Sequence, residues 1–107
     1  MKTSLLNFKA HDGSRNFSEL PESCSWDKLK KHIQRLPGAR IKDYISDQVT
    51  EMWLDFSFSG HTFTVNNQMG DFWFFVQDSN CPDEILTVVV EHCETLLDGQ
   101  STSYPPK

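Results

Sequence analysis

The chain has 107 residues, 37% of them hydrophobic, and a formal net charge of −5 at pH 7. This length supplies one hydrophobic core and too little material for two, and the apolar content excludes a disordered polymer. The negative charge argues against non-specific binding to nucleic acid or to anionic membranes, so we expect neither as a partner.

Residues 1–22 show no sustained hydrophobic period. Isolated apolar residues alternate with polar runs such as residues 11–16 (HDGSRN). This pattern predicts an irregular arm. Because the segment has no long apolar run, and no stretch of the chain approaches the length of a membrane span, we expect a cytoplasmic protein without a signal peptide. The apolar residues of the arm are Leu5, Leu6, Phe8, Phe17 and Leu20.

A first helix is predicted over residues 25–36. Ser25 is a suitable N-cap, and Pro37-Gly38 is a suitable stop. Between them the apolar residues recur at the spacing of one helical face. They are Trp26, Leu29, Ile33 and Leu36.

From residue 39 to residue 76 the apolar side chains recur at every second position. Turn-forming residues interrupt the pattern around residues 46–49 (SDQV), at Ser59-Gly60 and around residues 66–70 (NNQMG). The segment therefore predicts four strands in an antiparallel meander. The two-residue turn at Ser59-Gly60 places Phe58 opposite His61 and Phe56 opposite Phe63.

Two further turns set the other pairings. A loop over residues 67–70 places Val65 opposite Phe72, and a turn at residues 48–49 places Ile45 opposite Met52. All pairings send apolar residues to one inner face, and a slip of one residue would scatter them. The predicted inner set is Ile41, Ile45, Met52, Leu54, Phe56, Phe58, Phe63, Val65, Phe72, Phe74 and Val76.

A second helix is predicted over residues 82–97. Asn80 or Cys81 can cap it, Pro82 suits its first turn, and Gly99 follows its end. The tail, residues 99–107, is expected to be disordered. The chain then divides into an arm (1–22), a single α+β domain (23–98) and this tail. We expect two layers in the order α-β-β-β-β-α, with both helices on the Phe-rich face of the sheet.

The outer face of the predicted sheet combines aromatic rings with small polar side chains. Tyr44 is expected opposite Trp53, and Lys42 opposite Asp55 as a solvated charge pair. Exposed rings amid polar neighbours are typical of a binding surface. The candidate binding residues are Tyr44, Trp53, Trp73 and Phe75.

Four interpretations of this face stay open. The arm can fold back over the rings, a second copy of the chain can cover them in a homodimer, a different protein can bind there, or sugars or bases can stack on the rings. In addition, the strand around residues 73–76 is expected at a sheet edge without protective lysines. Such an edge can pair with the same strand of a second copy.

The three cysteines show no CxxC spacing and fit neither a disulfide framework nor a zinc ribbon, so we expect reduced thiols. Cys81 lies at a predicted helix start, where the helix dipole lowers a thiol pKa. Asp83 and Glu84 lie within one turn and oppose a thiolate. The alternative function is therefore a thiol-dependent redox or other enzyme that uses Cys81 with His61 or His92 nearby in space.

The histidine spacings match no metal site, and the chain contains no nucleotide-binding or hydrolase motif. We therefore predict no metal, no cofactor and no catalytic residue. The expected function is a small cytoplasmic non-enzymatic protein-binding or adaptor domain, immunity- or chaperone-like. It would bind a protein partner, or a second copy as a homodimer, through the outer aromatic face or an edge strand.

Overall fold

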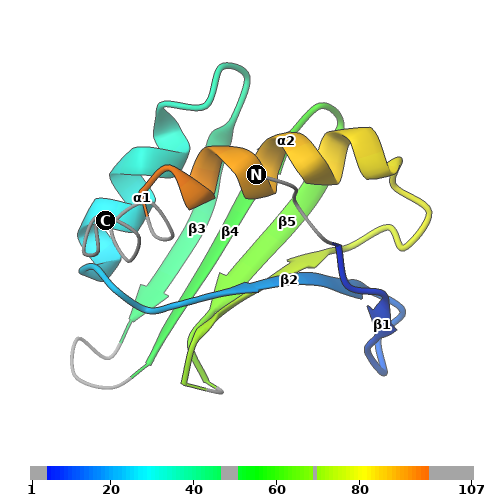
Figure 1. Cartoon of the computed structure of the whole chain (residues 1–107), viewed down its shortest axis with the longest axis horizontal. Helices are drawn as coiled ribbons and strands as arrows, with labels where there is room; N and C mark the ends of the chain where they lie inside the picture. Colours follow the sequence, from blue (N-terminus) through cyan, green and yellow to red (C-terminus); the bar gives the residue numbers. More distant parts are fainter. Residues whose placement is uncertain (1–4, 47–50, 69, 97–107) are drawn as a thin grey trace, which may run out of the picture.

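A computed structural model describes residues 5–46, 51–68 and 70–96. One antiparallel sheet has the strand order β1-β2-β6-β5-β4-β3, and two helices lie on one side of it (Figure 1). The predicted α+β class with an antiparallel sheet and two helices is confirmed, but the predicted four strands are wrong because the sheet has six. The elements are β1 (Phe8–Lys9), β2 (Arg15–Leu20), α1 (Trp26–Gln34), β3 (Arg40–Ser46), β4 (Met52–Phe58), β5 (His61–Asn66), β6 (Phe72–Val76) and α2 (Asp83–Glu94).

The two additional strands, β1 and β2, come from the segment predicted as an irregular arm, so that prediction is wrong for their residues. β2 pairs with β6, where Ser18 lies opposite Phe74 and Leu20 opposite Phe72. The register shifts between Asn16 and Ser18, and the extra residue, Phe17, is fully buried in the core. A bulge of this kind breaks the alternation of a strand, which explains why the sequence pattern hides β2.

The pairing with β2 makes β6 an interior strand. The prediction that residues 73–76 form an open edge is therefore wrong, and the edges of the sheet are β1 and β3. Arg15 also joins β2 to the helical layer. Its Nη1 lies 3.0 Å from Oδ1 of Asp83 at the start of α2, and its Nε donates to the carbonyl oxygen of Leu6 at 2.9 Å.

The central hairpin has the predicted register. Phe58 lies opposite His61 and Phe56 opposite Phe63. Ser59 and Gly60 have φ values of 54° and 83°, as a two-residue hairpin turn with a left-handed backbone requires. Between β5 and β6 the register differs from the prediction by two residues, so that Val65 lies opposite Phe74 instead of Phe72. An even shift keeps each side chain on its predicted face.

On β3 the register differs by one residue, and this reverses the faces. Ile41 lies opposite Phe56 as predicted, but a shift before Asp43 places Tyr44 opposite Leu54 and Ile45 opposite Trp53. Tyr44 therefore packs against the core, where Lys30 Nζ lies 4.9 Å from its ring centroid. The prediction of Tyr44 on the outer face is wrong, and so is the prediction of Ile45 on the inner face.

The same bulge changes the charges across β3 and β4. Asp43, and not Lys42, lies opposite Asp55. The predicted charge pair between Lys42 and Asp55 is therefore wrong. The bulge instead places two carboxylates directly across from each other, an arrangement that is unfavourable for the sheet.

Both helices begin close to their predicted starts. Ser25 caps α1 as predicted, and its side-chain oxygen accepts from the backbone nitrogen of Lys28 at 3.2 Å. The N-cap of α2 is Pro82, which makes no side-chain hydrogen bond, so Asn80 and Cys81 are not its capping residues. The predicted turn at residues 48–49, the predicted helix end at residue 97 and the tail over 99–107 lie outside the described residues.

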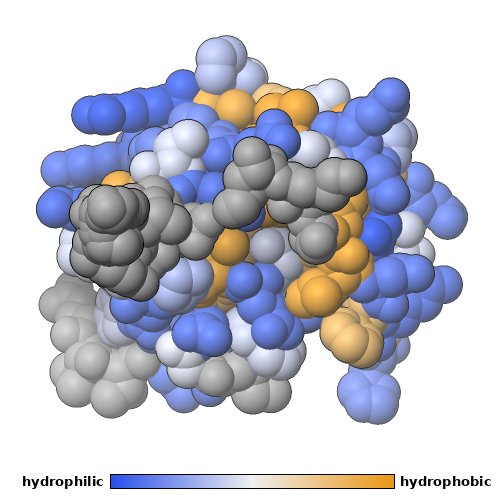
Figure 2. Space-filling view, in the orientation of Figure 1, coloured by the Kyte–Doolittle hydropathy of each residue, from blue (hydrophilic) through white to orange (hydrophobic). Residues whose placement is uncertain are grey.

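The core lies between the helices and the inner face of the sheet. On the helix side of the molecule, hydrophilic side chains surround most of the outline, with apolar groups in separate areas between them (Figure 2). The helices cover the inner face of the sheet (Figure 1). The largest fully buried side chains are Phe17, Phe56, Phe63, Phe72, Phe74, Leu29, Ile33, Met52, Leu54, Leu86 and Val65.

Candidate binding site

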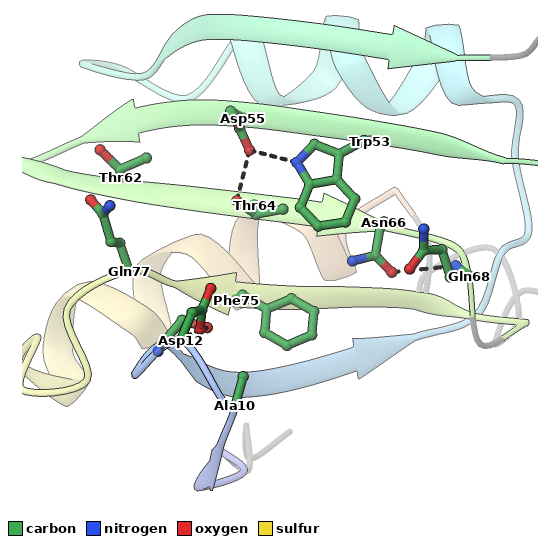
Figure 3. A pocket seen from close by; sticks show the side chains of 11 residues that line it. Ala10, Asp12, Trp53, Asp55, Thr62, Thr64, Asn66, Gln68, Phe75 and Gln77 are labelled. Carbon is green, nitrogen blue, oxygen red and sulfur yellow. Dashed lines mark hydrogen bonds between the residues drawn. The ribbon is translucent and has the colours of Figure 1, made fainter.

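An open groove of about 340 Å³ lies on the outer face of the sheet, away from the helices (Figure 3). Side chains of β4, β5 and β6 form its floor, and the turn between β1 and β2 forms one wall. The arm thus borders the outer face and extends the sheet. The groove is lined by Ala10, Asp12, Ser14, Trp53, Asp55, Thr62, Thr64, Asn66, Gln68, Phe75 and Gln77.

Two of the predicted binding residues, Trp53 and Phe75, line the groove. Trp53 has 38% of its surface exposed, and Phe75 is half-buried. Figure 3 looks onto the outer face and shows both rings with their faces toward the viewer. Trp73 lies beside the groove, with its ring centroid 6.5 Å from that of Phe75. The outer face therefore presents a row of aromatic rings.

Asp55 fixes the position of the Trp53 ring. Its Oδ1 accepts a hydrogen bond from Nε1 of Trp53 at 3.1 Å and another from Oγ1 of Thr64 at 2.7 Å (Figure 3). The three residues come from two paired strands, β4 and β5, so the sheet itself holds the network. Such a preformed arrangement reduces the side-chain entropy that is lost when a partner binds.

Asn66 contributes a polar group to the floor of the groove. Only 5% of the residue is exposed. Its Oδ1 accepts from the backbone nitrogen of Gln68 at 3.3 Å, and this bond fixes which end of the amide is the oxygen. Its Nδ2 has no hydrogen-bond partner among the described residues and points into the groove in Figure 3. Nδ2 is not among the buried side-chain atoms that lack a partner, so it keeps some accessible surface and is available to a ligand.

Several carboxylates lie on the outer face in and around the groove. Asp12 stands in the turn between β1 and β2, where hydrogen bonds from the hydroxyl and backbone nitrogen of Ser14 lower the pKa of its carboxyl. Asp43 lies opposite Asp55, and Glu19 lies opposite Trp73. Carboxylates thus surround the aromatic rings on three strands and a turn.

Sequence reasoning found part of this site. It placed Trp53, Phe75 and Trp73 on the outer face together with Asp55. It missed the residues of the β1–β2 turn, because their position depends on the pairing of β2 with β6. It also missed Gln68 and Gln77, which stand just beyond the ends of β5 and β6. A polar run between two apolar stretches, HDGSRN, was the only signal for the turn.

The alternative site around Cys81 has different properties. Cys81 is 3% exposed. Burial raises the pKa of its thiol, and the neighbouring carboxylates of Asp78 and Asp83 raise it as well, while Arg15 has the opposite effect. His92 belongs to another contact, since its Nε2 lies 2.6 Å from the carbonyl oxygen of His32. A thiol with a raised pKa is a weak nucleophile at neutral pH.

Cys24, Cys81 and Cys93 are free cysteines. Within the described ranges, no group of three or more His, Cys, Asp or Glu side chains is arranged to hold a metal ion. Neither α1 nor α2 is long and apolar enough to cross a membrane.

Comparison of the chain with protein-family models, with curated proteins and with solved structures finds no match. Functional inference therefore starts from the geometry of the groove.

Proposed function

We propose that this chain is a small non-enzymatic protein-binding domain that holds a protein partner in the outer-face groove. The observation that carries the proposal is the row formed by Trp53, Phe75 and Trp73 on the sheet face that the helices leave open. Tryptophan is among the residues that contribute most binding energy at protein interfaces. The hydrogen bond from Trp53 to Asp55 holds one of these rings in place before binding.

Several features favour the groove over an edge strand as the binding element. β6 is paired on both sides, and β1 has only two residues. The remaining edge, β3, carries Arg40, Lys42 and Asp43, which are all exposed. Charged side chains on an edge strand oppose pairing with another strand.

The charges of the groove favour a protein partner over a nucleic acid. The groove and its surroundings carry carboxylates, which repel phosphate groups. The free cysteines suit a reducing compartment, so we propose that the domain works in the cytoplasm. The raised pKa of Cys81 supports a non-enzymatic role over thiol chemistry.

A pull-down from the native host, with identification by mass spectrometry, tests this function. The bait chains are the wild type and a variant with Trp53→Thr and Trp73→Thr. We expect the double variant to remain folded and to lose the partner, because exposed aromatic anchors carry a large share of interface energy. Size-exclusion chromatography of both chains shows whether the partner is a second copy. A folded double variant that retains every partner of the wild type would contradict the proposal.

A further inference from the structure

The charges of the groove indicate the chemistry of its occupant. Among the described residues that line the groove, the ionisable ones are Asp12 and Asp55, and both are acids. Asp43, directly across from Asp55, adds a third carboxylate close by. Paired carboxylates repel each other across a strand pair, and a bound cation relieves that repulsion. The groove is therefore complementary to a positively charged group.

The aromatic rings restrict the shape of that cation. Trp53 and Phe75 present their faces to the groove in Figure 3. A ring face attracts a cation, and the flat guanidinium of arginine also stacks on the ring, whereas the lysine ammonium does not. An arginine side chain therefore fits the rings and the carboxylates together.

Two polar atoms of the groove, Oδ2 of Asp55 and Nδ2 of Asn66, further restrict the ligand. Both hydrogen bonds to Asp55 fall on Oδ1, so its Oδ2 has no partner among the described residues and can accept from a guanidinium. Nδ2 of Asn66 is a donor that a guanidinium cannot satisfy, since arginine has no acceptor. A backbone carbonyl beside the arginine can satisfy it. An arginine within a peptide chain can therefore satisfy both the Asp55 oxygen and the Asn66 nitrogen.

We propose that the groove binds an arginine of the protein partner, with the guanidinium stacked on the ring faces of Trp53 and Phe75 and paired with Asp55. A backbone carbonyl next to this arginine accepts from Nδ2 of Asn66. This inference rests on the proposed function and specifies the partner: it presents an exposed arginine in an extended segment or loop.

The test is an NMR titration of the full ¹⁵N-labelled chain with the peptide acetyl-Gly-Arg-Gly-amide. Matched peptides carry lysine, or citrulline, which has nearly the shape of arginine without its charge. We expect the arginine peptide to shift the Trp53 indole N–H and the Asn66 side-chain amide. The citrulline peptide should bind about tenfold more weakly or worse, because charge-assisted hydrogen bonds are the stronger ones. Equal binding of the arginine peptide and either matched peptide, or no shift at Trp53 and Asn66 with the arginine peptide, overturns the inference.

Asp55→Asn provides the matched variant, because asparagine keeps an oxygen that accepts from Trp53 and Thr64. We expect it to weaken binding of the arginine peptide about tenfold. Asp71→Asn makes the same change of charge at an exposed position outside the groove and should leave binding unchanged. An equal loss in both variants overturns the inference, because it shows a general effect of charge. Shifts at Trp53 and Asn66 with maltotriose but not with the arginine peptide overturn it in favour of a sugar site.

Pull-downs with the same variants separate this inference from the proposed function. If Asp55→Asn keeps the partner at full affinity while the double tryptophan variant loses it, arginine recognition is wrong and protein binding stands. If the folded double tryptophan variant keeps the partner, the proposed function is wrong, whatever the peptide does.

Discussion

Phe56 occupies the centre of the sheet and is fully buried, with its ring stacked on Phe63 at a centroid distance of 5.2 Å. Phe56→Ala should lower the free energy of unfolding by about 3–5 kcal/mol, because it removes a large buried ring and leaves a cavity. Urea denaturation measures this loss. Val88→Ala on α2, where the side chain is 44% exposed, is the control and should change stability by no more than about 0.5 kcal/mol. An unchanged urea midpoint for Phe56→Ala would contradict the β4–β5 register, because this register places Phe56 in the core opposite Phe63.

Cys81 should react slowly with iodoacetamide. Burial and the neighbouring carboxylates raise its pKa, so the thiolate fraction at pH 7 is small. We expect labelling no faster than that of a free cysteine in a short peptide, and slower than labelling of half-buried Cys24. Mass spectrometry of peptides after timed labelling gives both rates. Rapid labelling of Cys81 with an apparent pKa below about 6.5 would favour the thiol-enzyme alternative.

His32 and His92 join the two helices and predict a loss of stability in acid. Their rings stack at 4.2 Å, and Nε2 of each lies within hydrogen-bond distance of the backbone carbonyl oxygen of the other. Burial lowers the pKa of His32 below its ordinary value of 6.5, and the nearby charges of His92 and Arg35 also lower it, against the opposing effect of the His92 carbonyl.

A lowered pKa in the folded state means that the unfolded chain binds more protons as the pH falls. The stability associated with neutral His32 is therefore present above pH 6.5 and is lost as the pH falls through the folded-state pKa. Thermal melts between neutral and acidic pH measure this loss. His32→Gln retains a side-chain N–H donor without titrating near neutral pH, so its melting temperature should fall less. An equal fall in both chains would contradict this role of His32.

At the scale of elements, β2 pairs with β6 and contributes Phe17 to the core. Phe17 in its bulge is fully buried, and its ring lies 5.7 Å from that of Phe63 on β5. Phe17→Ala should therefore cost about 3–5 kcal/mol. Phe8→Ala on neighbouring β1, where the side chain is 63% exposed, should cost little. Guanidinium denaturation of the two variants distinguishes them. Equal, small effects would mean that residues 15–20 do not belong to the core.

The elements that the sequence predicted well are those with unbroken local signals. The Ser59-Gly60 turn fixed the β4–β5 register by its length alone. The Ser25 cap located the start of α1. The two-residue offset between β5 and β6 left the faces correct, because side chains alternate with a period of two.

The elements that the sequence did not predict contain bulges. A bulge at residue 42 sends Tyr44 inward and Ile45 outward, and a bulge at residue 17 hides β2. The bulge at residue 17 is accompanied by a tertiary contact that no local pattern reveals. Asn16 donates from its Nδ2 to the carbonyl oxygens of Ser18 and Phe74 across the irregular pair. The wall of the groove depends on β2, so it could not be predicted either.

At the scale of the whole molecule, the two faces of the sheet have different surroundings. The inner face and the helices form the core, which gives the domain its stability. The outer face keeps aromatic rings at a polar, acidic surface, in a groove that the β1–β2 turn borders. If the groove binds a partner, changes on this face should affect binding far more than folding.

The affinity of the purified partner for the Trp53→Thr variant tests this account most directly, measured by isothermal titration calorimetry. Trp53 is 38% exposed, so the variant should melt close to the wild type. We expect its affinity to fall about 30-fold or more, as for an interface anchor. Val88→Thr, a change of an exposed apolar residue on the helix side, should bind like the wild type. A folded Trp53→Thr variant that binds within about twofold of the wild type would contradict the assignment of the outer-face groove as the binding site.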